Sequence, residues 1–333
     1  MSLSILRPGL LTTVQDLGRC GYQKDGIIVS GAMDATALRV ANLLVGDAED
    51  AAGLEITLLG PKIRFEADHL IALTGANLSP TLNDQPVRLH RATWVAAGAE
   101  LAFGAPVAGS RAYLAVAGGL ATAPVLGSRA TYLRAGFGGL HGRALQAGDV
   151  LPVGRPGTVG RHIGRQLEGA AADWAQARWM PGPELRPKLA RHPIVRAIRG
   201  PEYGQFSTES QQDFWQQPFI VTTEADRMGF RLQGPALERE TAVELLSTAV
   251  AFGTVQVPTG RQAIVLLADH QTTGGYPRIA QVITADFSVL AQLAPGQSFR
   301  FAEVSLAEAQ ALYLAQEQQL RALRRGIGLK ALT

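Results

Sequence analysis

Short apolar runs separated by glycine-containing turns dominate this chain and constrain its fold more than any other feature. Glycine accounts for 37 of the 333 residues, about 11% against a typical usage near 7%. The runs are rich in β-branched residues and bounded by turn residues, as strands are: residues 69–74, 93–97, 112–117, 194–199, 219–223, 262–268 and 278–284. Their spacing predicts a mainly β barrel or sandwich rather than alternating strands and helices.

Two segments have helical periodicity. Asp34 is a predicted N-cap for a helix over residues 35–45, which ends at Gly46. Near the C-terminus, Ser305 and Glu308 have the spacing of a capping box. Apolar residues then recur at helical spacing and predict a C-terminal helix over residues 305–326.

A shift in composition divides the chain. Residues 155–192 are rich in arginine and proline and predict a connector, with a weak helical run around residues 169–177. We therefore expect an N-terminal half over residues 1–154 and a C-terminal half over residues 193–304, followed by the helix.

The charged residues exclude several classes of function. The net charge of +3 is too small and dispersed to indicate a nucleic acid or an anionic membrane as partner. Lysine occurs only four times, never after glycine, so the chain has no phosphate-binding loop of the GxxxxGK[ST] type. No lysine follows methionine, which argues against covalently attached biotin.

The cysteine and histidine contents argue against a disulfide within the chain and against a local metal site, and they leave open a metal site assembled from distant residues. Cys20 is the one cysteine, and no histidines have metal-ligand spacing. The first residues do not resemble a signal peptide, and the longest uncharged stretch, residues 112–128, is interrupted by glycine and proline. We expect a soluble, cytoplasmic protein.

Two polar clusters in the N-terminal half are candidate binding loops. Residues 12–19 precede a cluster that includes Ser30, Gly31 and Asp34, where backbone N–H groups could approach a ligand or simply form turns and a helix cap. The second cluster contains Gly118 and Gly119, then Ser128 and Arg129. It could hold an oxyanion, or be a hairpin with a surface arginine.

Two further clusters lie in the C-terminal half. Asp226 and Arg227 are adjacent in a predicted strand, so their side chains point to opposite faces. A buried acid held by a distant cation would be a candidate base, and a surface ion pair is the alternative. The densest polar run of the chain is a predicted binding surface on a loop; it follows Asp269 and His270 and comprises Gln271, Thr272, Thr273, Gly274, Gly275 and Tyr276.

Nine motifs in order resemble the allophanate-hydrolase-subunit-2 family, also described as biotin-dependent carboxyltransferase-like. They are TTVQDLGR (12–19), SGAMD (30–34), AN-x-LVG (41–46), LE-x-T-x-x-GP (54–61), YLAVAGG (113–119), VLGSR-x-TY (125–132), DRMG-x-RL-x-G (226–234), VQVP (255–258) and QTTGGYP-x-IA (271–280). The family includes the C subunit of bacterial 5-oxoprolinase, the Kip antagonist proteins and part of urea carboxylase. One departure is Ala225, where the family usually has serine.

The resemblance implies two cyclophilin-like β-barrel halves with few short helices. It also implies a component of an ATP-dependent 5-oxoprolinase that acts with an allophanate-hydrolase-subunit-1-type partner and a third subunit, with Mg²⁺ accompanying ATP. In that reaction Arg129 and Arg227 would stabilise phosphate oxygens and Asp226 would act as acid or base. The remaining cluster residues would surround the substrate. On this hypothesis, Arg227→Ala abolishes turnover and leaves the fold intact.

Two other functions fit the same resemblance. One is carboxyl transfer as in urea carboxylase, which would require a carboxybiotin source on a separate partner. The other is a non-enzymatic regulator like the Kip antagonist, which sequesters an inhibitor of a sensor kinase. Binding to a subunit-1-type protein fits both the oxoprolinase and the regulator, whereas dependence of ATP turnover on this chain would single out the oxoprolinase.

Overall fold

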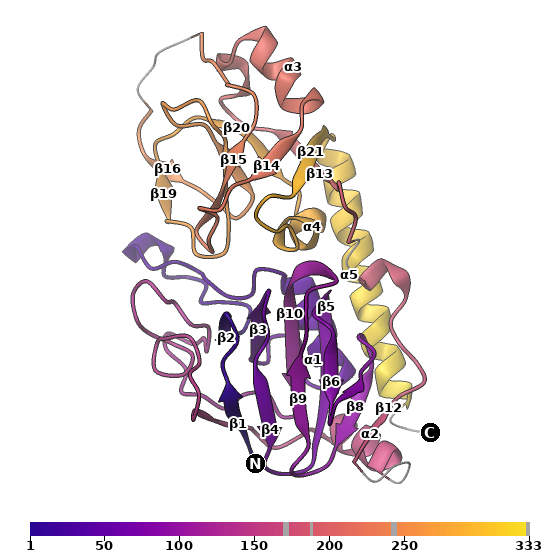
Figure 1. Cartoon of the computed structure of the whole chain (residues 1–333). Coiled ribbons are helices and arrows are strands. Elements are labelled where there is room, and N and C mark those ends of the chain that lie inside the picture. Colours follow the sequence, from indigo (N-terminus) through magenta and orange to yellow (C-terminus); the bar gives the residue numbers. More distant parts are fainter. Residues whose placement is uncertain (169–172, 187–188, 241–244, 331–333) are drawn as a thin grey trace. The chain divides into compact units, whose positions relative to one another are not determined.

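The computed structural model describes residues 1–168, 173–186, 189–240 and 245–330 (Figure 1). The chain divides into two compact units. Unit 1 comprises Met1–Arg19, Asp34–Pro187 and Gln316–Thr333, and unit 2 comprises Cys20–Met33 and Lys188–Ala315. This division differs from a simple cut after residue 154, because an early segment of the chain belongs to unit 2 and the last segment returns to unit 1.

Unit 1 contains two six-stranded sheets. Sheet 1 has the order β11 (Val150–Pro152), β1 (Ser2–Arg7), β4 (Lys62–Phe65), β9 (Glu100–Phe103), β6 (Pro80–Leu82) and β7 (Gln85–Pro86). Sheet 2 has the order β12 (Trp174–Gln176), β8 (Ala92–Val95), β5 (His69–Asn77), β10 (Ala108–Val116), β3 (Gly53–Thr57) and β2 (Leu11–Gln15).

Sheet 2 is the central layer of unit 1, because both of its faces are buried. Alternate side chains, among them Leu54, Leu73 and Leu114, join side chains of sheet 1 in one apolar core. The opposite face packs Ala72 and Ala115 in a second core with helices. These helices are α1 (Ala35–Leu44), α2 (Thr158–Glu168) and the C-terminal part of α5 (Leu306–Lys330). With sheet 1 on one face of sheet 2 and helices on the other, the described strands of unit 1 form stacked layers rather than the closed barrel predicted for this half.

Unit 2 contains a closed seven-stranded barrel, as predicted for this half. The order is β13 (Ile194–Arg199), β20 (Arg278–Val282), β17 (Thr254–Gln256), β18 (Ile264–Leu266), β15 (Gly229–Gln233), β14 (Phe219–Val221) and β21 (Ser298–Glu303). Its core includes packed aromatic rings, with Phe214 stacked on Phe301 at a centroid distance of 4.6 Å. The mainly β prediction is confirmed.

Smaller elements complete the fold. Unit 2 has the helices α3 (Thr208–Gln216) and α4 (Phe287–Ala291) and a ribbon of β16 (Thr248–Ala249) with β19 (Thr273–Gly274). Short 3₁₀ helices are η1 (Gln23–Asp25), η2 (Pro183–Leu185), η3 (Tyr203–Gln205) and η4 (Thr284–Asp286).

Both predicted helix starts are confirmed by their caps. The Asp34 carboxylate accepts a hydrogen bond from the N–H of Ala37 at 2.9 Å. At the start of α5, Ser305 and Glu308 each accept from the other's backbone N–H, at 3.2 and 2.8 Å. Helix α5 continues through Gly326 to Lys330, because its last turns are held by the burial of Ile327.

The predicted connector contains regular structure. Its helix is α2, which ends at Glu168, and residues 174–176 form strand β12 at the edge of sheet 2. The prediction of a helical run around residues 169–177 is therefore wrong for residues 174–176, and residues 169–172 lie outside the described part. Strand β12 forms because its residues pair with β8, a tertiary interaction that local periodicity does not report.

Candidate functional site

A buried carboxylate anchors the polar loop between β18 and β20 in unit 2. Asp269 accepts hydrogen bonds from Nε and Nη2 of Arg227 at 2.9 and 3.0 Å, and from the Ser30 hydroxyl at 2.7 Å. Nη2 of Arg227 also donates to the carbonyl oxygen of Gly31 at 2.6 Å. Both charged side chains are 6% exposed. This network fixes the first residue of the loop.

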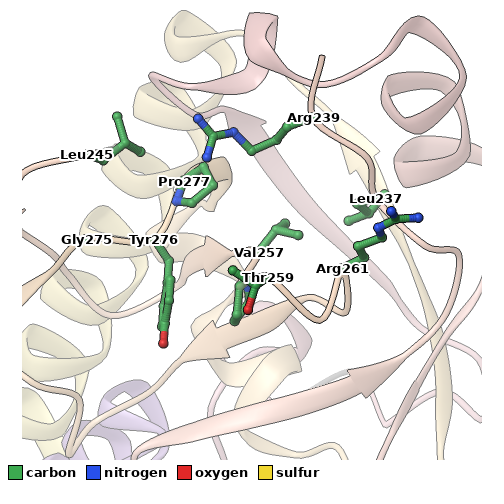
Figure 2. A pocket seen from close by; sticks show the side chains of 10 residues that line it. Leu237, Arg239, Leu245, Val257, Thr259, Arg261, Gly275, Tyr276 and Pro277 are labelled. Atoms are coloured by element: carbon green, nitrogen blue, oxygen red, sulfur yellow. The ribbon is translucent and has the colours of Figure 1, made fainter. Parts of the chain in front are cut away.

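The loop beyond this anchor folds back along β16. The N–H of Val250 donates to the carbonyl oxygen of Thr272 at 3.2 Å, and the β16–β19 pairing involves Thr273 and Gly274. A Cβ atom on Gly274 would lie 2.6 Å from Nε2 of the buried Gln256, so a larger residue here would require the Gln256 side chain to shift. The loop thereby leads to the half-exposed Tyr276, whose side chain is visible in Figure 2.

The end of this loop lines a pocket of about 590 Å³ (Figure 2). Its volume lies within the range of about 300–1,000 Å³ that is typical of small-molecule sites. The lining combines an apolar surface with two arginines: Leu237, Arg239, Leu245, Val257, Pro258, Thr259, Arg261, Gly275, Tyr276 and Pro277. Such a lining suits a small anionic molecule with an apolar body.

The structure brings three predicted residues of unit 2 together and places a fourth, Asp226, outside this network. Ser30 and Arg227 both donate to Asp269, and the carbonyl oxygen of Gly31 accepts from Arg227. Asp226 is exposed, and its carboxylate accepts from the N–H groups of Met228 and Gly229 at 2.8 and 3.1 Å. The buried acid held by a cation is therefore Asp269, which stands directly before the predicted loop.

In unit 1, the predicted loop at Ser128 and Arg129 surrounds a carboxylate of the chain itself. Asp16 accepts from the Ser128 hydroxyl at 2.7 Å and from the N–H groups of Arg129 and Gly18 at 2.5 and 2.8 Å. The Arg129 guanidinium donates through Nε to the carbonyl oxygen of Thr122 at 2.8 Å. The Ser128 hydroxyl and the Arg129 N–H, both predicted as oxyanion donors, thus bind Asp16.

The predicted donor at the two adjacent glycines of unit 1, Gly118 and Gly119, also binds a carboxylate of the chain itself. The N–H of Gly118 donates to both carboxylate oxygens of Asp47, at 3.0 and 2.9 Å. Burial raises the pKa of Asp47 from 3.8 to about 6, although hydrogen bonds from Gly118 and Gly119 act in the lowering direction. The expected oxyanion donor therefore has an internal partner.

This raised pKa predicts a stability difference that depends on pH. Between about pH 4 and pH 6 the unfolded Asp47 ionises while the folded one stays protonated, so its contribution to folding decreases as pH rises. We expect the free energy of unfolding of the native chain, relative to Asp47→Asn, to fall across this window and level off above it. Urea denaturation of both proteins at several pH values measures this; a constant difference would contradict it.

Asp34, the last predicted residue of unit 1, belongs to a buried polar network. Its N–H donates to the hydroxyl of Tyr113 at 2.7 Å, and that hydroxyl donates to the Glu55 carboxylate at 2.7 Å. All three side chains are buried. Burial, followed by the nearby carboxylates, raises the pKa of Tyr113 well above 10. Tyr113 and Glu55 lie inside two of the family-like motifs, but no local signal in the sequence marks either as part of a polar network.

Two kinds of feature are absent from the described residues. No group of three or more His, Cys, Asp or Glu side chains among them could hold a metal ion. No helix in the described part of the chain has the length and apolarity needed to cross a membrane.

The chain belongs to a known family. A family model described as "Carboxyltransferase domain, subdomain A and B" matches residues 25–303, and the chain is a member of this family. It is 44% identical over 317 residues to the C subunit of 5-oxoprolinase from Escherichia coli, covering 95% of either chain. The corresponding subunit of Haemophilus influenzae is 40% identical over 313 residues, or 94% of either chain. The solved structure of Kluyveromyces lactis urea carboxylase has a TM-score of 0.87 at 29% identity, covering 98% of this chain and 29% of that one.

Proposed function

We propose that this chain is a component of an ATP-dependent 5-oxoprolinase, the enzyme that opens 5-oxoproline to glutamate. The observation that carries the proposal is the 44% identity to the C subunit of a 5-oxoprolinase over 95% of both chains. A second such protein matches over a similar length. In this proposal the chain works with an allophanate-hydrolase-subunit-1-type partner and a third subunit, and it is inactive alone.

The reaction couples an unfavourable ring opening to ATP. Transfer of the γ-phosphoryl group to the amide oxygen releases ADP and activates the ring carbon for attack by water. Cleavage of the C–N bond then releases the amine and leaves γ-glutamyl phosphate, and a second water hydrolyses this acyl phosphate to glutamate and phosphate. The steps require cations or N–H donors for developing charge and a base for water. ATP would bring Mg²⁺, held together with the partner subunits.

The residue roles in this proposal follow the geometry of each unit. Asp226 is the proposed acid or base, since its carboxylate is exposed on a turn. Arg227 acts through Asp269, which anchors the loop that leads to the pocket. The partly buried Arg129 is proposed as the cation for phosphate oxygens in unit 1. Arg227 is thus a positioning residue rather than a phosphate ligand.

Carboxyl transfer is the second candidate. It is favoured by the family description and by the likeness to a urea carboxylase structure. The chain corresponds to 29% of that protein, and none of its lysines follows methionine as in a biotin-attachment site. A carboxyltransferase built on this chain would therefore depend on a separate biotinylated partner.

A reconstitution experiment tests the proposal. Glutamate and phosphate release from 5-oxoproline and ATP is measured with this chain and its two partner subunits, and again with each component omitted. We expect release only with the complete set. Equal release without this chain would refute its role in the enzyme. Failure of the complete set, with carboxylation when a carboxybiotin donor is added, would favour the second candidate.

A further inference from the structure

We propose that the pocket of unit 2 binds the substrate as a small cyclic amide that carries a carboxylate, with Arg239 and Arg261 as the carboxylate ligands. The inference rests on the proposed function and adds to it a location and a recognition chemistry. It begins from the arrangement in Figure 2, where Val257 and Thr259 lie between Tyr276 on one side and Arg261 on the other.

The charge of the lining favours an anion. Arg261 pairs with Glu238, but both side chains are more than half exposed, at 59% and 57%. An exposed pair of this kind contributes little free energy, so its guanidinium can exchange one carboxylate for another. Arg239 lines the pocket as well and donates through Nη2 to the amide oxygen of Gln205 at 2.9 Å. None of the described residues that line the pocket is acidic.

The apolar part of the lining favours a ring with methylene groups. Pro258 and Pro277 are rigid, and Val257 is buried beside them. These side chains offer a fixed surface to the CH₂ groups of a five-membered lactam, and burial of such groups stabilises a complex. The backbone here is also constrained, because Arg261 has a φ of 60°. Residues other than glycine that are held in this region of the φ/ψ map cluster at active sites and ligand-binding positions.

The same features distinguish two possible substrates. Urea is neutral and has no methylene groups, so neither the arginines nor the apolar surface would contribute to its binding. A lactam carboxylate uses both: a guanidinium recognises a carboxylate through paired N–H donors, and the ring covers apolar surface. The pocket therefore fits the substrate of an oxoprolinase better than that of a urea carboxylase.

Equilibrium binding tests the inference separately from turnover. Dissociation constants for 5-oxoproline, 2-pyrrolidone and urea are measured by calorimetric titration without ATP, using this chain alone and in its complex with the partner subunits. We expect 5-oxoproline to bind, and 2-pyrrolidone, which has the ring without the carboxylate, to bind about 10–100-fold more weakly, as expected for a hydrogen bond between charged groups. Equal affinity for the two lactams, or tighter binding of urea, would overturn the inference.

Four variants locate the binding. Arg239→Gln and Arg261→Gln are each expected to weaken 5-oxoproline binding about 10-fold or more, without changing the affinity for 2-pyrrolidone. The matched control is Arg231→Gln, which removes an exposed arginine of the same barrel that pairs with Glu224 at 3.2 Å outside the pocket. Its binding should equal that of the native chain. Thermal unfolding verifies that each variant is folded, and Arg239→Lys, which keeps the charge, should bind better than Arg239→Gln.

The outcomes separate the two proposals. If 5-oxoproline binds the native chain but neither glutamine variant weakens it, the pocket is wrong and the proposed function stands. If the variants weaken binding as expected but the complete reconstituted system releases no glutamate, the pocket stands and the oxoprolinase proposal fails. Absence of 5-oxoproline binding to both the chain and the complex overturns the pocket inference.

Discussion

Replacing Asp269 by alanine is expected to lower the free energy of unfolding by about 3–5 kcal/mol, because it breaks a buried ion pair by removing one partner. The Arg227 guanidinium would keep its desolvation cost and lose two hydrogen bonds to the carboxylate. Ser30 would lose its acceptor as well. Denaturant unfolding of the chain, with the midpoint and slope compared between native and variant proteins, measures the loss.

The control for this prediction is Glu224→Ala. Glu224 pairs with Arg231 at 3.2 Å, and the two side chains are 71% and 61% exposed. Loss of such a surface pair should change the free energy of unfolding by less than about 0.5 kcal/mol. A destabilisation below about 1 kcal/mol for Asp269→Ala would mean that the buried pair does not hold the loop.

This network changes what an Arg227 variant can reveal. The sequence alone predicts that Arg227→Ala abolishes turnover and leaves the fold intact. Arg227 is instead 6% exposed and bound to Asp269, so its removal leaves a buried carboxylate without its cation. We expect Arg227→Ala to lose stability as well as activity, and a loss of turnover by itself would not identify a catalytic residue.

Local signals predict the parts of the fold that depend on neighbouring residues. The cap at Asp34 and the capping box at Ser305 and Glu308 involve residues three apart, and both helices begin where the sequence places them. Strands such as β13 and β20 are evident as short apolar runs with turn residues at their ends. The edge strand β12 is not, because its pairing with β8 is a long-range interaction.

The candidate site is less predictable, because its contacts span most of the chain. Ser30 and Asp269 are 239 residues apart, and no periodicity connects them. The donors around Ser128 and Gly118 bind carboxylate oxygens of the chain itself. The sequence could not indicate that these oxygens belong to the side chains of Asp16 and Asp47.

The pocket shows the same dependence on tertiary structure. Three separate segments line it, ending in the loop that contains Tyr276. Only this last segment is evident from the sequence, because its polar residues are adjacent. Arg239 and Arg261 have no such signal: each is one arginine among many in an arginine-rich chain, and only the barrel places both beside the loop.

The second large effect is expected in unit 1, for Tyr113→Phe. Tyr113 lies directly opposite Glu55 in the β3–β10 pairing, which brings the phenol and the carboxylate together in the middle of sheet 2. The variant keeps the ring and its packing but removes the hydroxyl, which donates to Glu55 and accepts from the Asp34 N–H. We expect a loss of about 3 kcal/mol in the free energy of unfolding, since two buried polar groups each lose a partner.

The matched control for this substitution is Tyr313→Phe, because Tyr313 is 42% exposed on α5. It should be within about 0.5 kcal/mol of the native chain. The raised pKa of Tyr113 adds a second readout. Above pH 10 the unfolded phenol ionises while the folded one stays neutral, so this tyrosine's contribution to stability decreases as pH rises. The deficit of Tyr113→Phe should therefore shrink progressively as the pH rises above about 10, whereas a deficit independent of pH would mean that the phenol titrates normally in the fold.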